Sequence, residues 1–215
     1  MRTKSADDKM LIILSRLKKR YKEEMMTSLD YVNPWELLAS TMLSAQTTDA
    51  QVNKATPALF KRFPDPKSMA KLRPEQLYPY VKTLGFYRVK AKHVVGTAKM
   101  LHEQFHDKVP NTIAELTMLP GVGRKTANVV ISNAFNTNEG MAIDTHCITV
   151  ANRLFLYNTT NPVKIEERLM KMVPRKDWGN VSHLFIALGR DVCTAKKKYC
   201  SDCALKDICP SSDVR

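Results

Sequence analysis

Apolar residues recur along this chain at helical spacing, three or four positions apart. Two segments carry the pattern most clearly: Val94, Ala98, Leu101 and Phe105, then Val181, Leu184, Phe185 and Leu188. Each set places its side chains on one face of a helix, and Gly189 is placed to stop the second one. No run of alternating β-branched residues bounded by turns is present. The sequence therefore predicts an all-α fold.

Helix starts are predicted where a polar residue is followed, three positions on, by glutamate or glutamine. This pattern occurs at Asn33, Thr48 and Thr112. Pro57 is expected to kink or end the helix that begins after Thr48. The chain changes character near Gly140, after an asparagine-rich stretch, which predicts a loop between two bodies.

Charge narrows the class of partner. The 215 residues include 34 Lys and Arg against 21 Asp and Glu, a net charge of +13. Such a surplus favours a polyanion, either nucleic acid or an anionic membrane surface. We expect a cytoplasmic protein, associated with the nucleoid if it binds DNA, because neither a membrane-length apolar run nor a secretory signal is found.

A glycine-containing turn joins two predicted helices. Leu119-Pro120-Gly121-Val122-Gly123 holds two of the seven glycines in the chain. A helix, a Gly-x-Gly turn and a second helix direct free backbone N–H groups at a ligand, which suits phosphate whatever the base sequence. A tight turn between helices, with glycine only relieving strain, is the simpler alternative.

Lys125 lies in the first turn of the second of these helices, beside Arg124. The positive end of the helix dipole and the neighbouring guanidinium both disfavour a protonated amine there. A deprotonated lysine can attack an electrophilic carbon and form a Schiff base. The residues alone leave open an ordinary lysine that contacts phosphate.

Asp144 directly precedes a predicted helix that starts with Thr145-His146-Cys147. Taken alone, this position indicates a helix N-cap, which contributes about 1 kcal/mol.

Four of the five cysteines are clustered near the end of the chain, as Cys193, Cys200, Cys203 and Cys209. In a chain expected to be cytosolic, such clustering favours metal over disulfide. Structural zinc more often uses two Cys-x2-Cys pairs, and here there is one. The fifth, Cys147, is predicted to be a buried small hydrophobe.

Several of these segments together resemble the endonuclease III family of DNA glycosylases. The resemblance is carried by Leu119–Ala127, Leu43–Asp49, Ile143–His146 and the cysteine array, and covers almost the entire chain. It implies two helical domains flanking a DNA-binding cleft, residues 27–137 and residues 1–26 with 138–215. The first contains the helix-hairpin-helix, and the second contains a [4Fe–4S] cluster loop.

The family's catalytic residues correspond to Lys125 and Asp144. The resemblance implies that the lysine displaces the base through a Schiff base and that β-elimination then cuts the strand. The aspartate would stabilise oxocarbenium character at C1′. The implied activity is that of a bifunctional DNA glycosylase and AP lyase of base excision repair, acting on damaged, oxidised pyrimidines in double-stranded DNA. We expect it to work as a monomer.

The resemblance also implies DNA contacts. Gln46 would fill the gap left by the flipped base, and Phe86 would be the wedge on the other strand, unless it is core. The remaining candidates are Gly121, Gly123, Arg124, His146, Lys196, Lys197 and Lys198. A packed histidine and a solvated run of lysines are the plain alternatives for the last four.

Two other functions compete with this interpretation. A non-catalytic helix-hairpin-helix DNA-binding protein would share the Gly-x-Gly turn but would not need Lys125 together with Asp144. A monofunctional mismatch or adenine-specific glycosylase has another residue at the lysine position, and 215 residues leave no room for the adenine-specific branch's extra domain.

Overall fold

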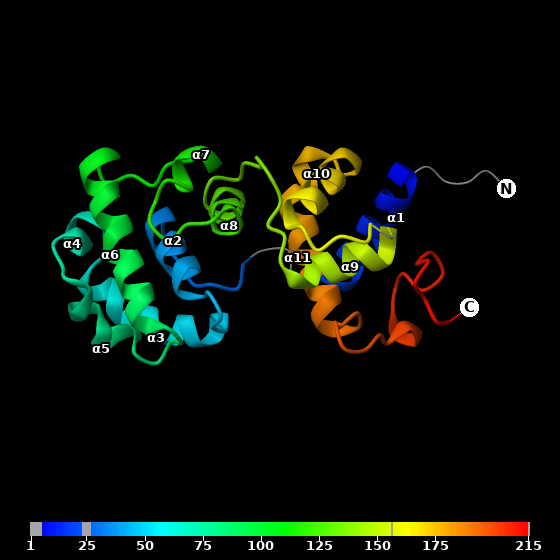
Figure 1. Cartoon of the computed structure of the whole chain (residues 1–215), viewed down its shortest axis with the longest axis horizontal. Coiled ribbons are helices and arrows are strands. Elements are labelled where there is room, and N and C mark those ends of the chain that lie inside the picture. The colour runs from blue at the N-terminus through cyan, green and yellow to red at the C-terminus, as the bar shows by residue number, and fades with distance from the viewer. Residues whose placement is uncertain (1–5, 23–26, 156, 215) are drawn as a thin grey trace. The chain divides into compact units, whose positions relative to one another are not determined.

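The structure, a computed structural model, describes residues 6–22, 27–155 and 157–214. The described part of the chain is helical, without a β-strand, which confirms the all-α prediction (Figure 1). The α-helices are α1 (Ala6–Arg20), α2 (Pro34–Leu43), α3 (Asp49–Arg62), α4 (Pro66–Ala70), α5 (Tyr78–Val81), α6 (Tyr87–Gln104), α7 (Ile113–Leu116), α8 (Arg124–Ala134), α9 (Thr145–Phe155), α10 (Pro162–Met172) and α11 (Trp178–Asp191). Short 3-10 turns are η2 (Pro74–Leu77), η3 (Arg175–Asp177) and η4 (Cys200–Asp202).

The chain divides into two compact units. One unit contains residues 28–139, and the other combines residues up to 27 with residues 140–215. The expected division at 27 and 137 differs from this by one or two residues. Residues 1–5 and 23–26 of the expected second domain lie outside the described residues.

In the unit of residues 28–139, α6 is the central helix. It packs against α2 and α4, and α2 in turn packs against α8. The predicted apolar face of α6 is buried at Val94, Ala98 and Leu101, whereas Phe105, just after the helix, is half-buried. Burial of this apolar surface, at about 25 cal/mol per Å², stabilises the unit.

The second unit is assembled from both ends of the chain. Helix α1 packs against α10 and α11, and α9 packs against α11. The predicted face of α11 is fully buried in this core, with Phe185 among its largest side chains.

Three local predictions need correction. Helix α3 does not end at Pro57, one of the two outcomes expected there, but continues to Arg62, and Thr48 forms no side-chain cap. Helix α11 continues past Gly189 to Asp191. A Cβ at Gly189 would lie 2.8 Å from Cβ of His146, so this glycine permits close packing of α9 on α11.

Among the described residues, no helix combines the length and apolar composition that a membrane span requires.

Candidate functional site

The Gly-x-Gly turn is held against α6. Gly121 has φ +77°, and a Cβ there would lie 2.5 Å from Cγ of His93. Both the left-handed backbone and this close approach require glycine. The hydroxyl of Thr97 donates to the carbonyl of Pro120 at 2.8 Å, which anchors the turn from the same helix.

The second helix of the hairpin begins with accessible backbone. Gly123 is the N-cap of α8 and has no side chain to cover the first N–H groups. A Cβ at Gly123 would meet nothing within 4 Å. Arg124 and Lys125 follow in the first turn and are exposed. The geometry offers an anion site with an amine beside it.

Two further turns of the same unit lie next to each other. Gln46 and Phe86 both adopt left-handed backbone, at φ 54° and 56°. Phe86 is 68% exposed, so it is not the core residue of the alternative interpretation. A Cβ at Gly85 would lie 3.8 Å from the Gln46 carbonyl oxygen, which places the two turns in contact range.

Asp144 acts as the cap that the sequence predicts. Its Oδ1 accepts the backbone N–H of Cys147 at 2.9 Å, in the first turn of α9. The carboxylate is half-buried. His146, two residues on, is half-buried and packs against Gly189.

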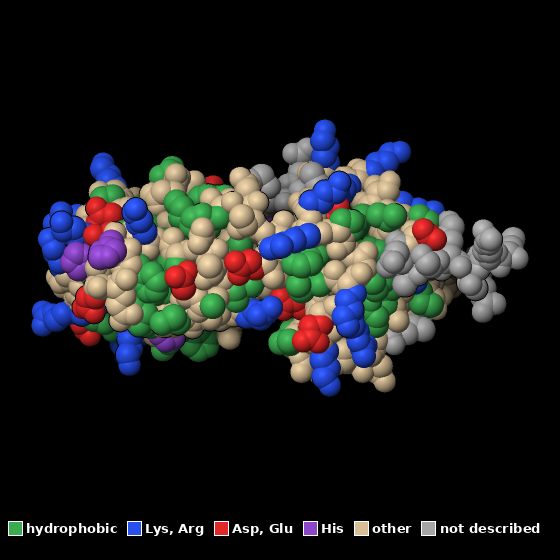
Figure 2. All heavy atoms as spheres, turned by 90° about the horizontal axis from the view of Figure 1, so that it is seen from above, with side chains coloured by type: hydrophobic (Ala, Val, Ile, Leu, Met, Phe, Trp, Pro, Cys, Tyr) green, Lys and Arg blue, Asp and Glu red, His purple; other side chains and the backbone are tan. Residues whose placement is uncertain are grey.

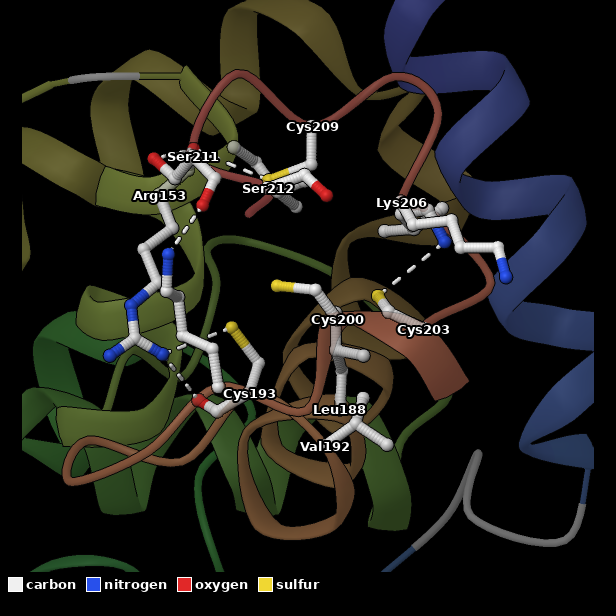
Figure 3. A pocket seen from close by; sticks show the side chains of 13 residues that line it. Arg153, Leu188, Val192, Cys193, Cys200, Cys203, Lys206, Cys209, Ser211 and Ser212 are labelled. Carbon is white, nitrogen blue, oxygen red and sulfur yellow. Dashed lines mark hydrogen bonds between the residues drawn. The ribbon is translucent and has the colours of Figure 1, made fainter. Parts of the chain in front are cut away.

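The four clustered cysteines line one pocket, and their sulfur atoms face a common space (Figure 3). Leu188, Val192 and Leu205 contribute its apolar wall. None of the four forms a disulfide. In the described part of the chain, no group of three His, Cys, Asp or Glu side chains is arranged to hold a metal ion.

Burial raises the pKa of the Cys203 and Cys209 thiols. The neighbouring cysteines of the pocket raise both pKa values further, because adjacent thiolates repel one another. Holding all of them as thiolates requires a positive centre among them, which a metal group supplies. The thiols, the apolar wall and their spread around the pocket fit a multi-iron cluster.

Arg153 of α9 braces this pocket. Its Nη1 donates to the carbonyl oxygens of Cys193 and Thr194, at 3.1 and 2.9 Å, and to Sγ of Cys193 at 3.2 Å. The backbone N–H of Leu205 approaches Sγ of Cys203 at 3.5 Å. Donors directed at sulfur stabilise the thiolate form of metal ligands.

The three lysines between the first two cysteines differ in their surroundings. An antiparallel bridge between Cys193 and Lys198 closes the loop. Lys198 Nζ donates to the carbonyl of Ser211 at 2.7 Å and lies 3.5 Å from Asp213 Oδ2. Lys196 and Lys197 are exposed, the latter with its ammonium 4.9 Å from the Tyr199 ring centre. Only the first two are therefore presented to solvent as the sequence suggests.

Lys and Arg side chains protrude from both units on the face shown in Figure 2. The structure places the four cysteines around one pocket, and it separately places the Gln46 turn next to the Phe86 turn. Lys125 and Asp144 belong to different units. Sequence reasoning missed His93, Thr97, Lys90 and Arg153, whose roles depend on partners distant in the chain. No signal in the local sequence could have identified these four residues.

Comparison with known proteins gives concordant matches. Residues 39–175 match the HhH-GPD superfamily base excision DNA repair protein family. Endonuclease III of Synechocystis sp. is 45% identical over 94% of this chain and 92% of its own. Endonuclease III of Escherichia coli (strain K12) is 41% identical over 94% of each.

Solved structures agree. A trapped endonuclease III–DNA covalent intermediate is similar with a TM-score of 0.88 and 35% identity, covering 98% of this chain and 97% of that one. A thermostable thymine-DNA glycosylase shares the fold, at TM-score 0.84 and 19% identity.

Proposed function

Because this chain belongs to the endonuclease III family of HhH-GPD base excision DNA repair proteins, we propose that it removes damaged bases from double-stranded DNA and then cuts the strand as an AP lyase. The observation that carries the proposal is the exposed Lys125 in the first turn of α8, directly after the Gly-x-Gly turn. An endonuclease III of 35% identity has been trapped as a covalent intermediate with DNA, which supports a covalent mechanism here.

The lysine supplies the nucleophile. Its neutral amine attacks C1′ of the damaged nucleotide, and the bond from C1′ to the base breaks. The amine then loses a proton and the bond from C1′ to O4′ breaks, which opens the sugar ring, protonates O4′ and leaves an imine at C1′. The imine acidifies the hydrogen at C2′, so a base can remove it and β-elimination breaks the C3′–O3′ bond and expels the 3′ phosphate.

Asp144 stabilises the positive charge that develops on the sugar as the base departs. A carboxylate has two oxygens, and one of them accepts the Cys147 N–H. The negative charge of this carboxylate stabilises the oxocarbenium-like transition state and helps to orient the attacking amine.

Backbone and side chains of the hairpin hold the duplex. The N–H groups after Gly123 and the Arg124 guanidinium bind phosphate without reading sequence. Gln46 fills the space of the extruded nucleotide, and Phe86 enters the stack as an apolar wedge. Lys196 and Lys197 add phosphate contacts from the other unit, and His146 stays a candidate for a sugar or phosphate contact.

Cys193, Cys200, Cys203 and Cys209 would hold a [4Fe–4S] cluster. When bound, the cluster ties together the segment that carries the exposed lysines and has a net charge of about −2 with its thiolates. We place the enzyme on DNA in the cytoplasm, as a monomer acting on oxidised pyrimidines.

A mismatch-specific, monofunctional glycosylase is the nearest alternative. The fold does not separate the two, because a thymine-DNA glycosylase has it as well. The lysine at position 125 favours the bifunctional enzyme, because only that enzyme uses an amine nucleophile.

Borohydride trapping on abasic DNA tests the proposal. The wild-type protein should give a covalent adduct of enzyme and DNA, because borohydride reduces the imine to a stable amine. Lys125→Gln should still bind abasic DNA and give no adduct, while Lys71→Gln, which changes an exposed lysine after α4, should trap like wild type. Full trapping by Lys125→Gln would rule out this nucleophile.

A further inference from the structure

One lysine of the first unit is buried at the junction of the Gln46 and Phe86 turns. Lys90 lies in α6 and is 5% exposed. Its Nζ donates to Oγ1 of Thr47 at 2.6 Å, and among the described residues it has no carboxylate partner. Burial lowers the pKa of its amine. A buried amine without a counter-ion is costly, so a stability role alone does not explain why lysine is present.

The same residue holds both turns. The backbone N–H of Lys90 donates to the carbonyl of Phe86 at 3.1 Å, which ends the Phe86 turn in the first turn of α6. Its side chain reaches Thr47, the residue directly after Gln46. Lys90 therefore links the residue proposed to fill the gap with the residue proposed to enter the stack.

Both turns need such a link. Gln46 and Phe86 have left-handed backbone, which residues with side chains rarely adopt without tertiary contacts that hold them there. A Cβ at Gly85 would lie 3.8 Å from the Gln46 carbonyl oxygen and 3.9 Å from Thr47 Oγ1. The Thr47 hydroxyl thus sits where the two turns meet.

We propose that Lys90 is a positioning residue that fixes the Gln46 turn relative to the Phe86 turn, so that the two side chains enter the duplex as one preorganised pair. The proposal rests on the function proposed above. Lys90 should affect the step in which the nucleotide is extruded, because rigid placement of the inserting side chains lowers the free energy needed to reach the flipped state. Contact with intact DNA and the lysine chemistry do not depend on it.

Two pairs of variants isolate the bond. Lys90→Met keeps the length of the side chain and removes the donor, and Thr47→Val keeps the shape and removes the acceptor. Thr47→Ser retains the hydroxyl and should restore function. Lys54→Met, an exposed lysine of α3, controls for loss of positive charge in the same unit.

Insertion is read directly from 2-aminopurine placed opposite a stable tetrahydrofuran abasic analogue. Single-turnover excision on a duplex with one oxidised pyrimidine is measured alongside, together with thermal unfolding. Lys90→Met and Thr47→Val should each slow insertion and excision roughly 10-fold, the loss expected for one hydrogen bond of a charged donor. The double variant should be no slower than either single variant, because both remove the same bond.

The stability readout separates positioning from a structural role. Lys90→Met should unfold at the same or a higher temperature than wild type, since an apolar side chain suits a buried site better than an uncompensated amine. Affinity for undamaged duplex should stay within about twofold of wild type, because the phosphate contacts remain in place.

Several outcomes would overturn the inference: wild-type insertion by Lys90→Met, additive losses in the double variant, or losses accounted for by unfolding. Gln46→Ala separates this failure from failure of the proposed function. If Gln46→Ala slows insertion and Lys90→Met does not, only the role of Lys90 is wrong. If wild-type protein neither excises nor traps, the proposed function itself fails.

Discussion

Asp144 shows how one side chain can serve both the fold and the proposed reaction. Its Oδ1 accepts the Cys147 N–H at the start of α9, which satisfies a backbone donor that the helix cannot pair. The cap also helps to fix the direction of the carboxylate, so its charge is held in place. A charge held in place before the reaction stabilises a transition state more effectively than a mobile one.

Replacement of Asp144 by asparagine separates these two roles. Asparagine is an equally good N-cap, so the melting temperature of Asp144→Asn should be close to that of wild type. Base excision should fall roughly 100-fold or more, because the charge is lost from the position where cationic character develops. Single-turnover excision and thermal unfolding of the same preparation are the measurements. An excision rate equal to that of wild type would leave Asp144 as a cap only.

At this scale, sequence reasoning finds residues whose chemistry is local. Lys125 follows a Gly-x-Gly turn, and Asp144 directly precedes a helix, so each could be identified from its immediate neighbours. Lys90 and Arg153 could not, because their partners lie 43 and 40 residues away, at Thr47 and Cys193.

At the scale of elements, α1 is joined to the end of the chain by a row of ion pairs. Its basic residues Arg16, Lys18 and Arg20 pair with three acidic residues in the last 40 residues of the chain, namely Asp207, Asp177 and Asp191. Arg20 also donates to the carbonyl of Asp202, within the cysteine segment, at 2.7 Å. The helix therefore contacts both α11 and the cysteine segment.

Asp191 makes the most of these contacts and should show a pH signature. Hydrogen bonds from Tyr21 and Arg20 hold the pKa of its carboxyl below the ordinary value of 3.8. The folded state therefore favours the carboxylate, and the stabilisation is present above pH 3.8 and lost as the pH falls through the lower, folded-state pKa. Asp191→Asn should lower the melting temperature by roughly 2–4 °C at neutral pH, for a loss near 1 kcal/mol on this partly exposed side chain.

Melting followed by circular dichroism from pH 7 downward checks this expectation. The difference between wild type and Asp191→Asn should disappear only below pH 3.8. Asp202→Asn, which changes an exposed carboxylate of the same unit, should melt like wild type throughout. A difference that persisted unchanged in acid would assign the effect to side-chain shape and not to charge.

Element boundaries show where local signals are insufficient. The predicted cap at Thr112 is correct, since its hydroxyl accepts the Glu115 N–H, whereas the similar pattern at Thr48 forms no such bond. Pro57 does not end α3, because burial of Leu59 and Phe60 after it stabilises the last turn. Gly189 is needed because His146 of α9 packs closely against it, and the residues next to Gly189 in the sequence give no indication of that contact.

At the scale of the molecule, net charge is a better guide to the partner than to the contacts. The surplus of +13 predicted a polyanion, and the proposed DNA substrate is one. Individual lysines differ, however, because the ammonium of Lys198 is already engaged by Ser211 and Asp213. The three lysines are adjacent in the sequence, so the sequence alone could not predict that Lys198 differs from Lys196 and Lys197 in its contacts.

The salt dependence of DNA binding should reveal that difference. Replacing Lys196 and Lys197 together by alanine should flatten the slope of log K against log salt by about 1 to 2, since each phosphate contact contributes roughly 0.9. Damaged and undamaged duplexes should weaken almost equally. Lys198→Ala should leave the slope close to that of wild type.

Visible absorption must be the same for all of these variants, so that loss of a metal group does not account for the change. An unaltered slope in the double variant would show that the two lysines only face solvent.

The unit assembled from both ends of the chain dictates an order of maturation during synthesis. Residues 28–139 leave the ribosome as one continuous stretch and can complete their own core at once. Helix α1 is made first, yet its partner α11 ends at Asp191, so α1 must wait while most of the polypeptide is translated. The cysteine segment emerges later still, when the rest of the molecule is nearly complete. The apolar face of α1 is thus exposed for longer during synthesis than that of any helix in the unit of residues 28–139. A chain cut short before α11 would retain a folded unit of residues 28–139 and a first helix without its packing partner.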